Sequence, residues 1–314
     1  MKKKFRVSSS EFRVEGLKSK VQSPKPKIEA GRNEKGFREG KTSPHASSMI
    51  FGISPVLEAL RANSRRIDKI VVAEGAKERR LLEIVELARQ NNILVNRVSR
   101  DSLSKLLAED AIHQGVAAYA AAADYLSAGE IFDGIIANAL LVVLDGVEDP
   151  RNLGAILRTV ECSGADGVFI PERRAVGLTD TVAKSSAGAV EHVKISKVAN
   201  INRLIEELKK RNIWVVGTSG DAGMIYTEWD WKQPSALVLG GEGMGLHRLV
   251  AENCDVVVKI PMYGRIESLN VSVAAGVVLF EAVRQRVRSS KFKVPSSDRA
   301  SHFELETRNS ELET

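Results

Sequence analysis

The sequence predicts an α/β protein in which a small α/β domain precedes a larger, doubly wound parallel sheet. Strand-like apolar runs alternate with amphipathic helical segments over residues 49–289, and this alternation is typical of α/β folds. The run ALLVVLDGV holds almost no polar residue, as expected of a parallel strand that is covered on both faces. A chain of 314 residues, 43% of them hydrophobic, can fill two such cores.

The positive charge of the chain is concentrated at its N-terminal end. Residues 1–48 contain 13 Lys and Arg residues against 5 Asp and Glu residues and few apolar ones, so we expect a disordered tail. Its charge favours an arm that binds nucleic acid. A solubilising extension or an organellar targeting segment is the alternative, although the glutamates argue against targeting. Residues 290–314 are also polar, and we expect them to be disordered.

The sequence gives no sign of a membrane segment, a disulfide or a metal site. No apolar run reaches the ~18–20 residues of a membrane helix, and no apolar segment of a secretory signal follows the basic start. Cys162 and Cys254 are far apart and the His residues are scattered, which fits neither a disulfide framework nor zinc-ligand spacing. We therefore expect a cytoplasmic protein with no metal.

Residues 49–123 predict a compact layer of helices and strands. A short helix in FGISPVLEAL would have Ser54 as its cap and Pro55 at its first position. The strand IDKIVVAE, the helix KERRLLEIVELARQNN and the strands ILVNRVS and QGVAAYAAA follow. With no nucleophile–base pair, metal cluster or phosphate loop, this domain is interpreted as a binding or targeting module, with a structural cap as the alternative. Residues 124–138 would form a linker with one amphipathic turn.

Residues 139–289 predict the doubly wound sheet. The strand ALLVVLDGV leads into a helix through LGAILRTVECSG, the strand DGVFIP and the small-residue segment TVAKSSAGAVEH. Next come the strand VKIS, the helix NINRLIEELKKRN, the strands IWVVGTS and SALVLG, the short helix HRLVAEN and the strand DVVVKIP. A long helix from about Leu269 to Arg288 completes the pattern. In such a sheet the ligand crevice lies at the carboxyl ends of the strands.

The stretch LVLGGEGMGL, residues 237–246, is a glycine-rich loop after a buried strand. It lacks the Gly-Lys-Ser/Thr of a Walker A loop. Gly241 and Gly243 open a G-x-G, but the next glycine, Gly245, comes one position too early for the dinucleotide fingerprint. The loop therefore implies no phosphate, yet it can hold a nucleoside through backbone hydrogen bonds, with the base against apolar neighbours.

The segment after the strand ALLVVLDGV carries two polar candidates. Asn152 stands where the loop enters the helix, so it can cap the helix or hold a polar group of a ligand. Arg158 lies six residues further along, in an otherwise apolar helical stretch. A place on the solvated face is the simple interpretation. We instead expect Leu153 and Ile156 to lie near the same side, where a guanidinium needs a partner.

The start of the last helix carries Ser268, Leu269 and Asn270. Ser and Asn side chains at a helix N-terminus suit a phosphate or a ribose hydroxyl. An ordinary cap at Ser268 is the alternative. The small and apolar face of the same helix predicts packing, including packing between subunits, rather than chemistry.

Taken together, these segments resemble the motifs of a known family. Asn152 and Arg158, the loop GGEGMG and the run IPMYGRIESLNVSVA match its three motifs in order, over about residues 140–287. The chain is thereby similar to the SpoU/TrmH family of the SPOUT superfamily, which are S-adenosylmethionine-dependent RNA 2′-O-ribose methyltransferases. The segment from FGISPVLEAL to HQGVAAYA resembles the ribosomal-protein-like (L30e-like) RNA-binding domain of the branch that modifies a guanosine ribose in large-subunit (23S) rRNA.

This resemblance implies a fold, a cofactor and an assembly. The family folds its C-terminal part into a deep trefoil knot, a rare exception among un-knotted chains. It works as a homodimer, with the knot region and the last helix at the interface. Its contacts to S-adenosylmethionine are mostly made by the backbone and fall, by motif position, on Gly240, Ile260, Leu269 and, more weakly, Thr218.

The resemblance also implies roles in catalysis, in which a ribose 2′-hydroxyl attacks the methyl group of a sulfonium. Arg158 is expected beside that hydroxyl. An arginine pKa exceeds ~12, so electrostatic stabilisation and orientation are expected of it rather than base catalysis. Asn152 and Asn270 would fix Arg158 and the nucleotide, Ser268 would hold a phosphate or ribose oxygen, and Glu242 would position the loop and the arginine.

Alternatives remain for the substrate and for the activity. Ribosomal RNA is expected first, because tRNA enzymes of this family typically lack a separate N-terminal domain; a tRNA 2′-O-methyltransferase is second. A non-catalytic RNA-binding protein belongs to a different class, and the complete set of polar residues argues against it. A Rossmann dehydrogenase is remote, because no acidic residue follows a proper glycine fingerprint at the required distance.

Overall fold

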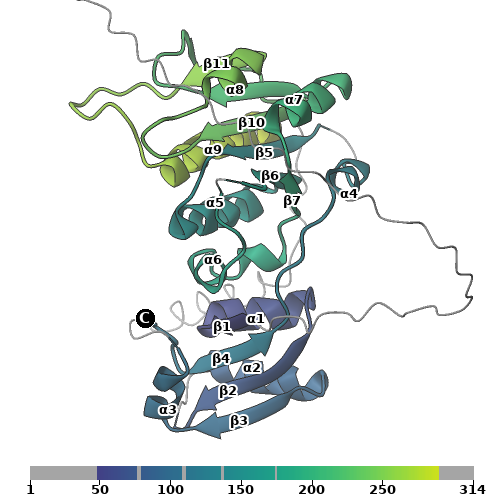
Figure 1. Ribbon diagram of the computed structural model, residues 1–314, viewed down its shortest axis with the longest axis vertical. Coiled ribbons are helices and arrows are strands. Elements are labelled where there is room, and N and C mark those ends of the chain that lie inside the picture. The colour runs from purple at the N-terminus through teal and green to yellow at the C-terminus, as the bar shows by residue number, and fades with distance from the viewer. Residues whose placement is uncertain (1–47, 76–78, 108–110, 136–137, 174, 290–314) are drawn as a thin grey trace, which may run out of the picture. The chain divides into compact units, whose positions relative to one another are not determined.

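The computed structural model describes residues 48–75, 79–107, 111–135, 138–173 and 175–289 (Figure 1). The two tails expected to be disordered lie outside these residues, apart from Ser48. All described residues belong to one compact unit of the chain. That unit contains one four-stranded and one seven-stranded sheet. Within the described residues, no helix is both long and apolar enough to cross a membrane.

The four-stranded sheet is built from residues 48–120. Its spatial order is β1 (Ser48–Phe51), β4 (Val116–Ala120), β2 (Ile67–Ala73) and β3 (Leu94–Val98). Strand β4 is antiparallel to both neighbours, whereas β2 and β3 are parallel and are joined through α2 (Arg79–Gln90). Helices α1 (Ile53–Ala62) and α2 pack on one face, and α3 (Arg100–Lys105) packs on the other.

The predicted strands and helices of this segment are confirmed, with two additions and one correction. Strand β1 and helix α3 span four and six residues, too few for a clear periodicity. Helix α1 begins at Ile53, after Gly52 with φ 95°. Ser54 is therefore not its cap and Pro55 is not its first residue. A positive φ is available to glycine at little cost, so Gly52 makes this sharp entry possible.

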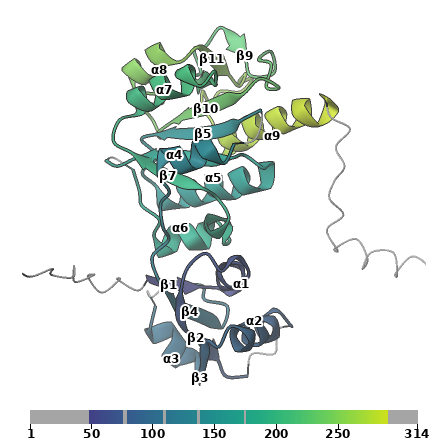
Figure 2. The ribbon, with the colours of Figure 1, turned by 90° about the vertical axis from the view of Figure 1, so that its right-hand side faces the viewer.

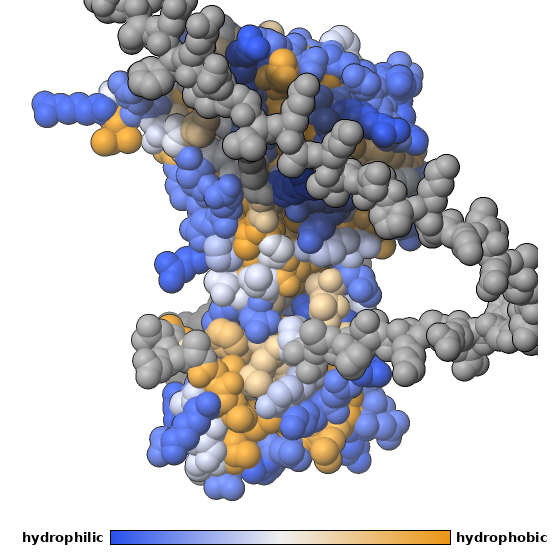
Figure 3. Space-filling view, viewed as in Figure 1, coloured by the Kyte–Doolittle hydropathy of each residue, from blue (hydrophilic) through white to orange (hydrophobic). Residues whose placement is uncertain are grey.

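One row of side chains runs across the four-stranded sheet. The strand register aligns Met49, Tyr119, Lys69 and Leu94 on successive strands. The Nζ atom of Lys69 lies 4.2 Å from the centre of the Tyr119 ring, within the range of a cation–π contact. Figure 3 shows hydrophobic surface over this sheet. An aromatic ring, a cation and apolar side chains thus share one face.

The segment expected to be a linker is part of the fold. Helix α4 (Ala128–Asp133) begins with a capping box between Ser127 and Glu130, which satisfies free backbone donors at the helix start. It buries Ile131 and Phe132 in the core of the seven-stranded sheet. A full helix therefore replaces the single amphipathic turn that the sequence predicts.

The seven-stranded sheet is parallel throughout its paired strands, which confirms the predicted α/β architecture. Its spatial order is β7 (Ile195–Val198), β6 (Gly167–Pro171), β5 (Leu140–Asp145), β10 (Ser235–Gly240), β8 (Trp214–Thr218), β11 (Val256–Lys259) and β9 (Met224–Ile225). Only the two-residue β9 lacks a counterpart among the predicted strands. The small-residue segment contains α6 (Asp180–Ser185) and the short 3-10 helix η1 (Ala189–Glu191).

Helices cover both faces of this sheet (Figures 1 and 2). Alternate residues of β5 enter different cores, since successive side chains of a strand point to opposite faces. Val142 and Leu144 join the core shared with α5 (Pro150–Ser163) and α9 (Val271–Ser289). Leu141 and Val143 join the core shared with α7 (Ile201–Lys210) and α8 (Arg248–Asn253). The nearly unbroken apolar run of β5 follows from this two-sided burial.

A buried ion pair joins the regions of the two sheets. The Nε atom of Arg65, just before β2, lies 3.1 and 2.9 Å from the two carboxylate oxygens of Glu191 in η1. The two side chains are only 4% and 2% exposed. Ser64 Oγ donates a further hydrogen bond of 2.6 Å to the same carboxylate. The charges are therefore paired as well as removed from water.

Candidate active site

Strands β5 and β10 are neighbours at the point where the strand order reverses. Strands β6 and β7 follow β5 in sequence and extend the sheet on one side of β5. The later strands β8 and β10 lie on the other side of β5. Ligand crevices in open α/β sheets form at such a reversal, outside the carboxyl ends of the strands. The loops after β5 and β10 therefore frame the expected crevice.

These two loops pack against each other through glycine backbone. The Gly241 N–H donates to the Asp145 carbonyl at 2.8 Å, and the Gly245 N–H donates to the Gly241 carbonyl at 3.2 Å. A Cβ on Gly240 would lie 2.0 Å from the carbonyl carbon of Gly245, and one on Gly241 would lie 2.2 Å from the carbonyl oxygen of Gly146. A side chain at either position would push the backbone apart, so the loop requires these glycines.

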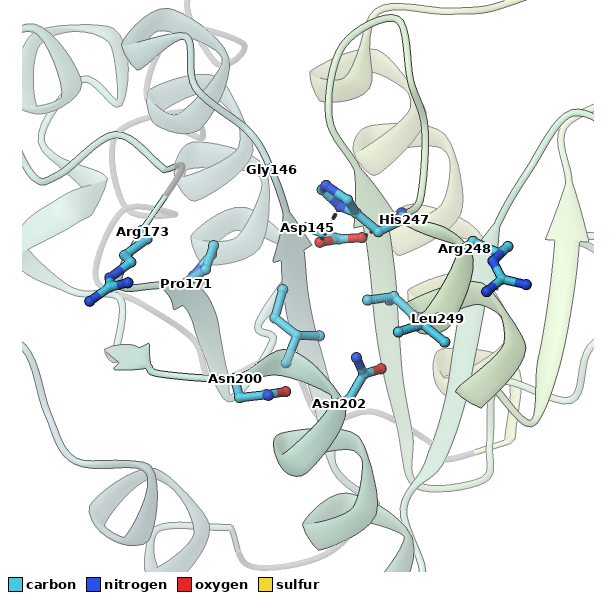
Figure 4. Close-up of a pocket in the computed structure, with 11 residues that line it drawn as sticks. Asp145, Gly146, Pro171, Arg173, Asn200, Asn202, His247, Arg248 and Leu249 are labelled. Carbon is cyan, nitrogen blue, oxygen red and sulfur yellow. Dashed lines mark hydrogen bonds and ion pairs between the residues drawn. The ribbon is translucent and has the colours of Figure 1, made fainter. Parts of the chain in front are cut away.

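A buried carboxylate fixes the far end of the glycine loop. Asp145 is 4% exposed. Its Oδ2 accepts the backbone N–H of His247 at 2.8 Å, and its Oδ1 lies 2.9 Å from Nδ1 of the same residue (Figure 4). Sequence reasoning missed this pair because the two residues are 102 positions apart. The available signal is an acidic residue at the end of an otherwise apolar strand.

Three of the predicted catalytic residues form one hydrogen-bonded chain. Asn152 Nδ2 donates to Glu242 Oε1, and Asn270 Nδ2 donates to Asn152 Oδ1 at 3.0 Å. The three residues come from α5, the glycine loop and the residue before α9. The loop is thus connected to both helices on one face of the sheet.

The helix starts differ from their predicted form. Asp149 caps α5 by accepting the N–H of Arg151. Asn152 therefore lies inside the helix, and its side-chain amide makes the hydrogen bonds to Glu242 and Asn270 described above. Helix α9 begins at Val271, and Asn270 Oδ1 accepts the N–H of Ser272 at 2.9 Å. Ser268 is exposed, and among the described residues no hydrogen bond is found for its side chain. Neither Asn152 nor Ser268 is therefore the cap.

Arg158 lies on the exposed face of α5, so the expectation of a guanidinium among apolar neighbours is wrong. At about 100° per residue, Arg158 points roughly 140° away from Leu153 and about 160° away from Ile156, both of which are buried. Within the described part of the chain it makes no hydrogen bond or ion pair. The solvated face, the simpler interpretation, is where the side chain lies.

Three of the four predicted cofactor residues lie at the ends of adjacent strands, and the fourth lies shortly before α9. Thr218 ends β8 and Gly240 ends β10, while Ile260 directly follows β11. Leu269 is exposed in the segment between β11 and α9. Thr218 Oγ1 donates to the Val238 carbonyl at 3.2 Å, so its hydroxyl ties two strands together. Across the described residues, no group of His, Cys, Asp and Glu side chains is arranged to hold a metal ion.

Two families match the chain in sequence. The SpoU rRNA Methylase family matches residues 139–280, and the family described as RNA 2′-O ribose methyltransferase substrate binding matches residues 49–126. The first match covers the seven-stranded sheet with the glycine loop, and the second covers the four-stranded sheet.

Individual relatives agree with these matches. A 23S rRNA (guanosine-2′-O-)-methyltransferase RlmB of Ralstonia nicotianae is 44% identical over 241 residues, 76% of this chain and 96% of the relative. YacO of Bacillus subtilis, assigned to the TrmH family as a tRNA/rRNA methyltransferase, is 41% identical over 240 residues, 76% of this chain and 95% of its own length.

The fold is shared with a solved structure. The AdoMet-bound rRNA methyltransferase from Sinorhizobium meliloti is 27% identical with a TM-score of 0.63, over 76% of this chain and 87% of that one. Motifs, sheet topology, family matches and relatives therefore agree: the chain belongs to the SpoU (TrmH) family of RNA 2′-O-ribose methyltransferases.

Proposed function

We propose that this protein transfers the methyl group of S-adenosylmethionine to the 2′-hydroxyl of a guanosine ribose in 23S rRNA. The observation that carries this proposal is the chain of Asn152, Glu242 and Asn270, which joins the glycine loop to α5 and α9. The relatives named as 23S rRNA (guanosine-2′-O-)-methyltransferases, at 44% identity, support the substrate. A tRNA ribose is the second candidate, supported by the mixed tRNA/rRNA name of the relative from Bacillus subtilis.

The residues at the strand ends fit S-adenosylmethionine. Gly240 and Gly241 leave no room for a Cβ, so the ligand would meet backbone groups there, as a nucleoside held by backbone hydrogen bonds requires. Ile260 and Leu269 offer apolar surface for the adenine ring, and Thr218 borders the same edge. When bound, the cofactor supplies an electrophilic methyl group on a sulfonium.

The polar residues would position the ribose and stabilise its developing charge. Arg158 carries a permanent positive charge on the exposed face of α5, where it can reach an RNA strand and stabilise an alkoxide. Asn152 and Asn270 would orient the nucleotide, with Glu242 holding the loop against them. Ser268, exposed before α9, would contact a phosphate or ribose oxygen. The hydroxyl proton would pass to water or to an RNA phosphate.

We infer a homodimer in which α9 lies at the interface and the chain around the glycine loop forms the trefoil knot of the family. The exposed apolar residues Val273, Phe280 and Val287 recur every seven positions along α9, at 51%, 49% and 42% exposure. A seven-residue apolar spacing forms one stripe along a helix, suited to packing against another helix. The insertion of β10 between β5 and β8 supports the crossing that a knot requires.

Residues 49–123 would bind the RNA as a ribosomal-protein-like domain, residues 124–138 would connect it, and residues 139–289 would form the methyltransferase domain. The row containing Tyr119 and Lys69 supports RNA contact, because aromatic rings stack on bases and lysines attract phosphates. The basic tail, residues 1–48, would add affinity. The site of action would be the cytoplasm, where rRNA is assembled in bacteria such as the named relatives.

The proposal is tested with methyl-labelled S-adenosylmethionine and, separately, unmodified large-subunit rRNA and tRNA. Labelled RNA is digested with alkali, since a 2′-O-methyl group blocks cleavage at its own linkage. A labelled alkali-resistant dinucleotide from rRNA alone is expected. Label in tRNA alone would overturn the rRNA assignment. Absence of cofactor binding together with retained RNA binding would favour a non-catalytic RNA-binding protein.

A further inference from the structure

A cavity of about 480 Å³ opens beside the glycine loop, on the face of the sheet covered by α7 and α8. Its walls come from the ends of β5 and β6 and from the starts of α7 and α8 (Figure 4). The volume lies within the ~300–1,000 Å³ typical of small-ligand sites. The hydrogen-bonded chain of the candidate active site lies on the opposite face, with α5 and α9. The cavity therefore shares Asp145 and His247 with the glycine loop but lies on the other face of the sheet from those hydrogen-bonded residues.

The lining combines apolar surface with directed polar groups. Pro171, Ile201 and Leu249 supply apolar surface, and Leu249 is exposed there despite its hydrophobic side chain. Asn202 and His247 supply amide and imidazole groups. Because Asp145 holds Nδ1 of His247, the ring is fixed and its Nε2 is left for a hydrogen bond. Apolar surface with a few fixed polar groups suits a nucleobase.

Two arginines flank the cavity. Figure 4 shows Arg173 and Arg248 on opposite sides of it. Among the described residues, no hydrogen bond or ion pair is found for Arg173. Arg248 forms an ion pair with Glu252 at 3.2 Å, through side chains that are largely exposed. An exposed pair of this kind contributes little to stability and exchanges easily. Both guanidinium groups are therefore available to bind phosphate.

We propose that this cavity holds one nucleotide of an RNA strand, with its base against the apolar wall and its two flanking phosphates on Arg173 and Arg248. A free mononucleotide has the same base and phosphate groups, but it carries phosphate on one side of the nucleoside only. Cations on two opposite sides match a strand that enters and leaves. The buried carboxylate of Asp145 faces His247 with both oxygens, which reduces its repulsion of the strand. The inference rests on RNA as the substrate of the proposed function.

Three variants test this proposal in the full chain. Arg173→Ala removes a flanking cation, and Leu249→Trp fills the cavity from an exposed position. Lys210→Ala, at the far end of α7, removes an equal charge outside the cavity and serves as the control. The probe is a fluorescein-labelled single-stranded RNA fragment, with fluorescence anisotropy recorded over a series of salt concentrations, and guanosine 5′-monophosphate as the free competitor. Calorimetry with S-adenosylmethionine reports separately on the cofactor site.

We expect Arg173→Ala to weaken RNA binding about tenfold, the lower end for a hydrogen bond to a charged group. The slope of log K against log salt should fall by about 0.7, the value for one contact to a single strand. Leu249→Trp should weaken RNA binding with little change in slope, and Lys210→Ala should match the parent protein. Cofactor affinity should be unchanged in all three, and millimolar guanosine 5′-monophosphate should compete poorly.

The proposal would be overturned if both cavity variants kept the RNA affinity and the salt slope of the parent protein. It would also be overturned if they lost no more RNA affinity than Lys210→Ala. Strong competition by guanosine 5′-monophosphate would assign the cavity to a free nucleotide instead of a strand. The proposed function is judged by other readouts. A parent protein that binds RNA in this cavity yet transfers no methyl group contradicts the proposed function and leaves this inference standing.

Discussion

Replacing Gly240 with Ala tests whether close backbone packing builds the glycine loop. The new Cβ would lie 2.0 Å from the Gly245 carbonyl carbon and 2.3 Å from the Leu246 nitrogen. Both contacts are backbone atoms, so relief requires the loop to move by about 1 Å. Overpacking of this kind costs about 1–3 kcal/mol, which corresponds to a fall in Tm of roughly 2–12 °C for a chain of this size. A displacement of ~1 Å should also reduce turnover about 10²-fold.

Two further glycines provide matched controls. Gly243 lies in the same loop with open space around it but at φ 82°, so Gly243→Ala measures backbone strain alone, about 1–2 kcal/mol. Gly223 has open space and no such φ, so Gly223→Ala should behave like the parent. Calorimetric binding of S-adenosylmethionine and thermal melting are measured for all three. Parental cofactor affinity in Gly240→Ala, with a Tm equal to that of Gly223→Ala, would refute the argument from close packing.

Other predictions concern charge, pH and thiol reactivity. Arg158→Ala should lower turnover by about 10²–10³-fold without changing calorimetric affinity for S-adenosylmethionine, because its side chain is exposed on α5; retained turnover would exclude its proposed role. Burial raises the pKa of Asp180, so the native state binds a proton more tightly than the unfolded chain, and this contribution to stability is lost as pH rises through the folded pKa. The free energy of unfolding of Asp180→Asn, measured by urea titration, should therefore increase relative to that of the parent protein as pH rises above about 4. A difference between the two free energies that stays constant across pH would contradict this. Burial raises the pKa of Cys254 to about 11, whereas Cys162 is exposed, so iodoacetamide at mildly alkaline pH should modify Cys162 first, as mass spectrometry of digested protein would record.

The long, strongly patterned elements are predictable from the sequence, and the short ones are not. Strand β5 and helix α7 show their burial in the residue pattern itself. Strand β9 has two residues, so its extended form depends on pairing with β11 rather than on local preference. Helix α1 starts at Ile53 because Gly52 has a positive φ. The adjacent Ser54 and Pro55 are a common helix-start signal, and they predict a later start.

The motifs of the sequence identify residues of the candidate site, but they do not show which of these residues are in contact. Asn152, Glu242 and Asn270 meet only because distant segments fold onto one sheet edge. The pairing of Asp145 with His247 has the same origin, and no local pattern reports it. The orientation of Arg158 could have been obtained from helical geometry, since its angle to the buried residues of α5 follows from their spacing alone.

The ion pair of Arg65 with Glu191 has a consequence for how the chain unfolds. Removing one of the two side chains would leave the other, almost fully buried charge without its partner, which costs about 3–5 kcal/mol. The pair couples the region of the four-stranded sheet to the region of the seven-stranded sheet, so we expect both regions to melt in a single cooperative transition. If one region is replaced by that of a related protein, Arg65 and Glu191 must therefore be kept or replaced together.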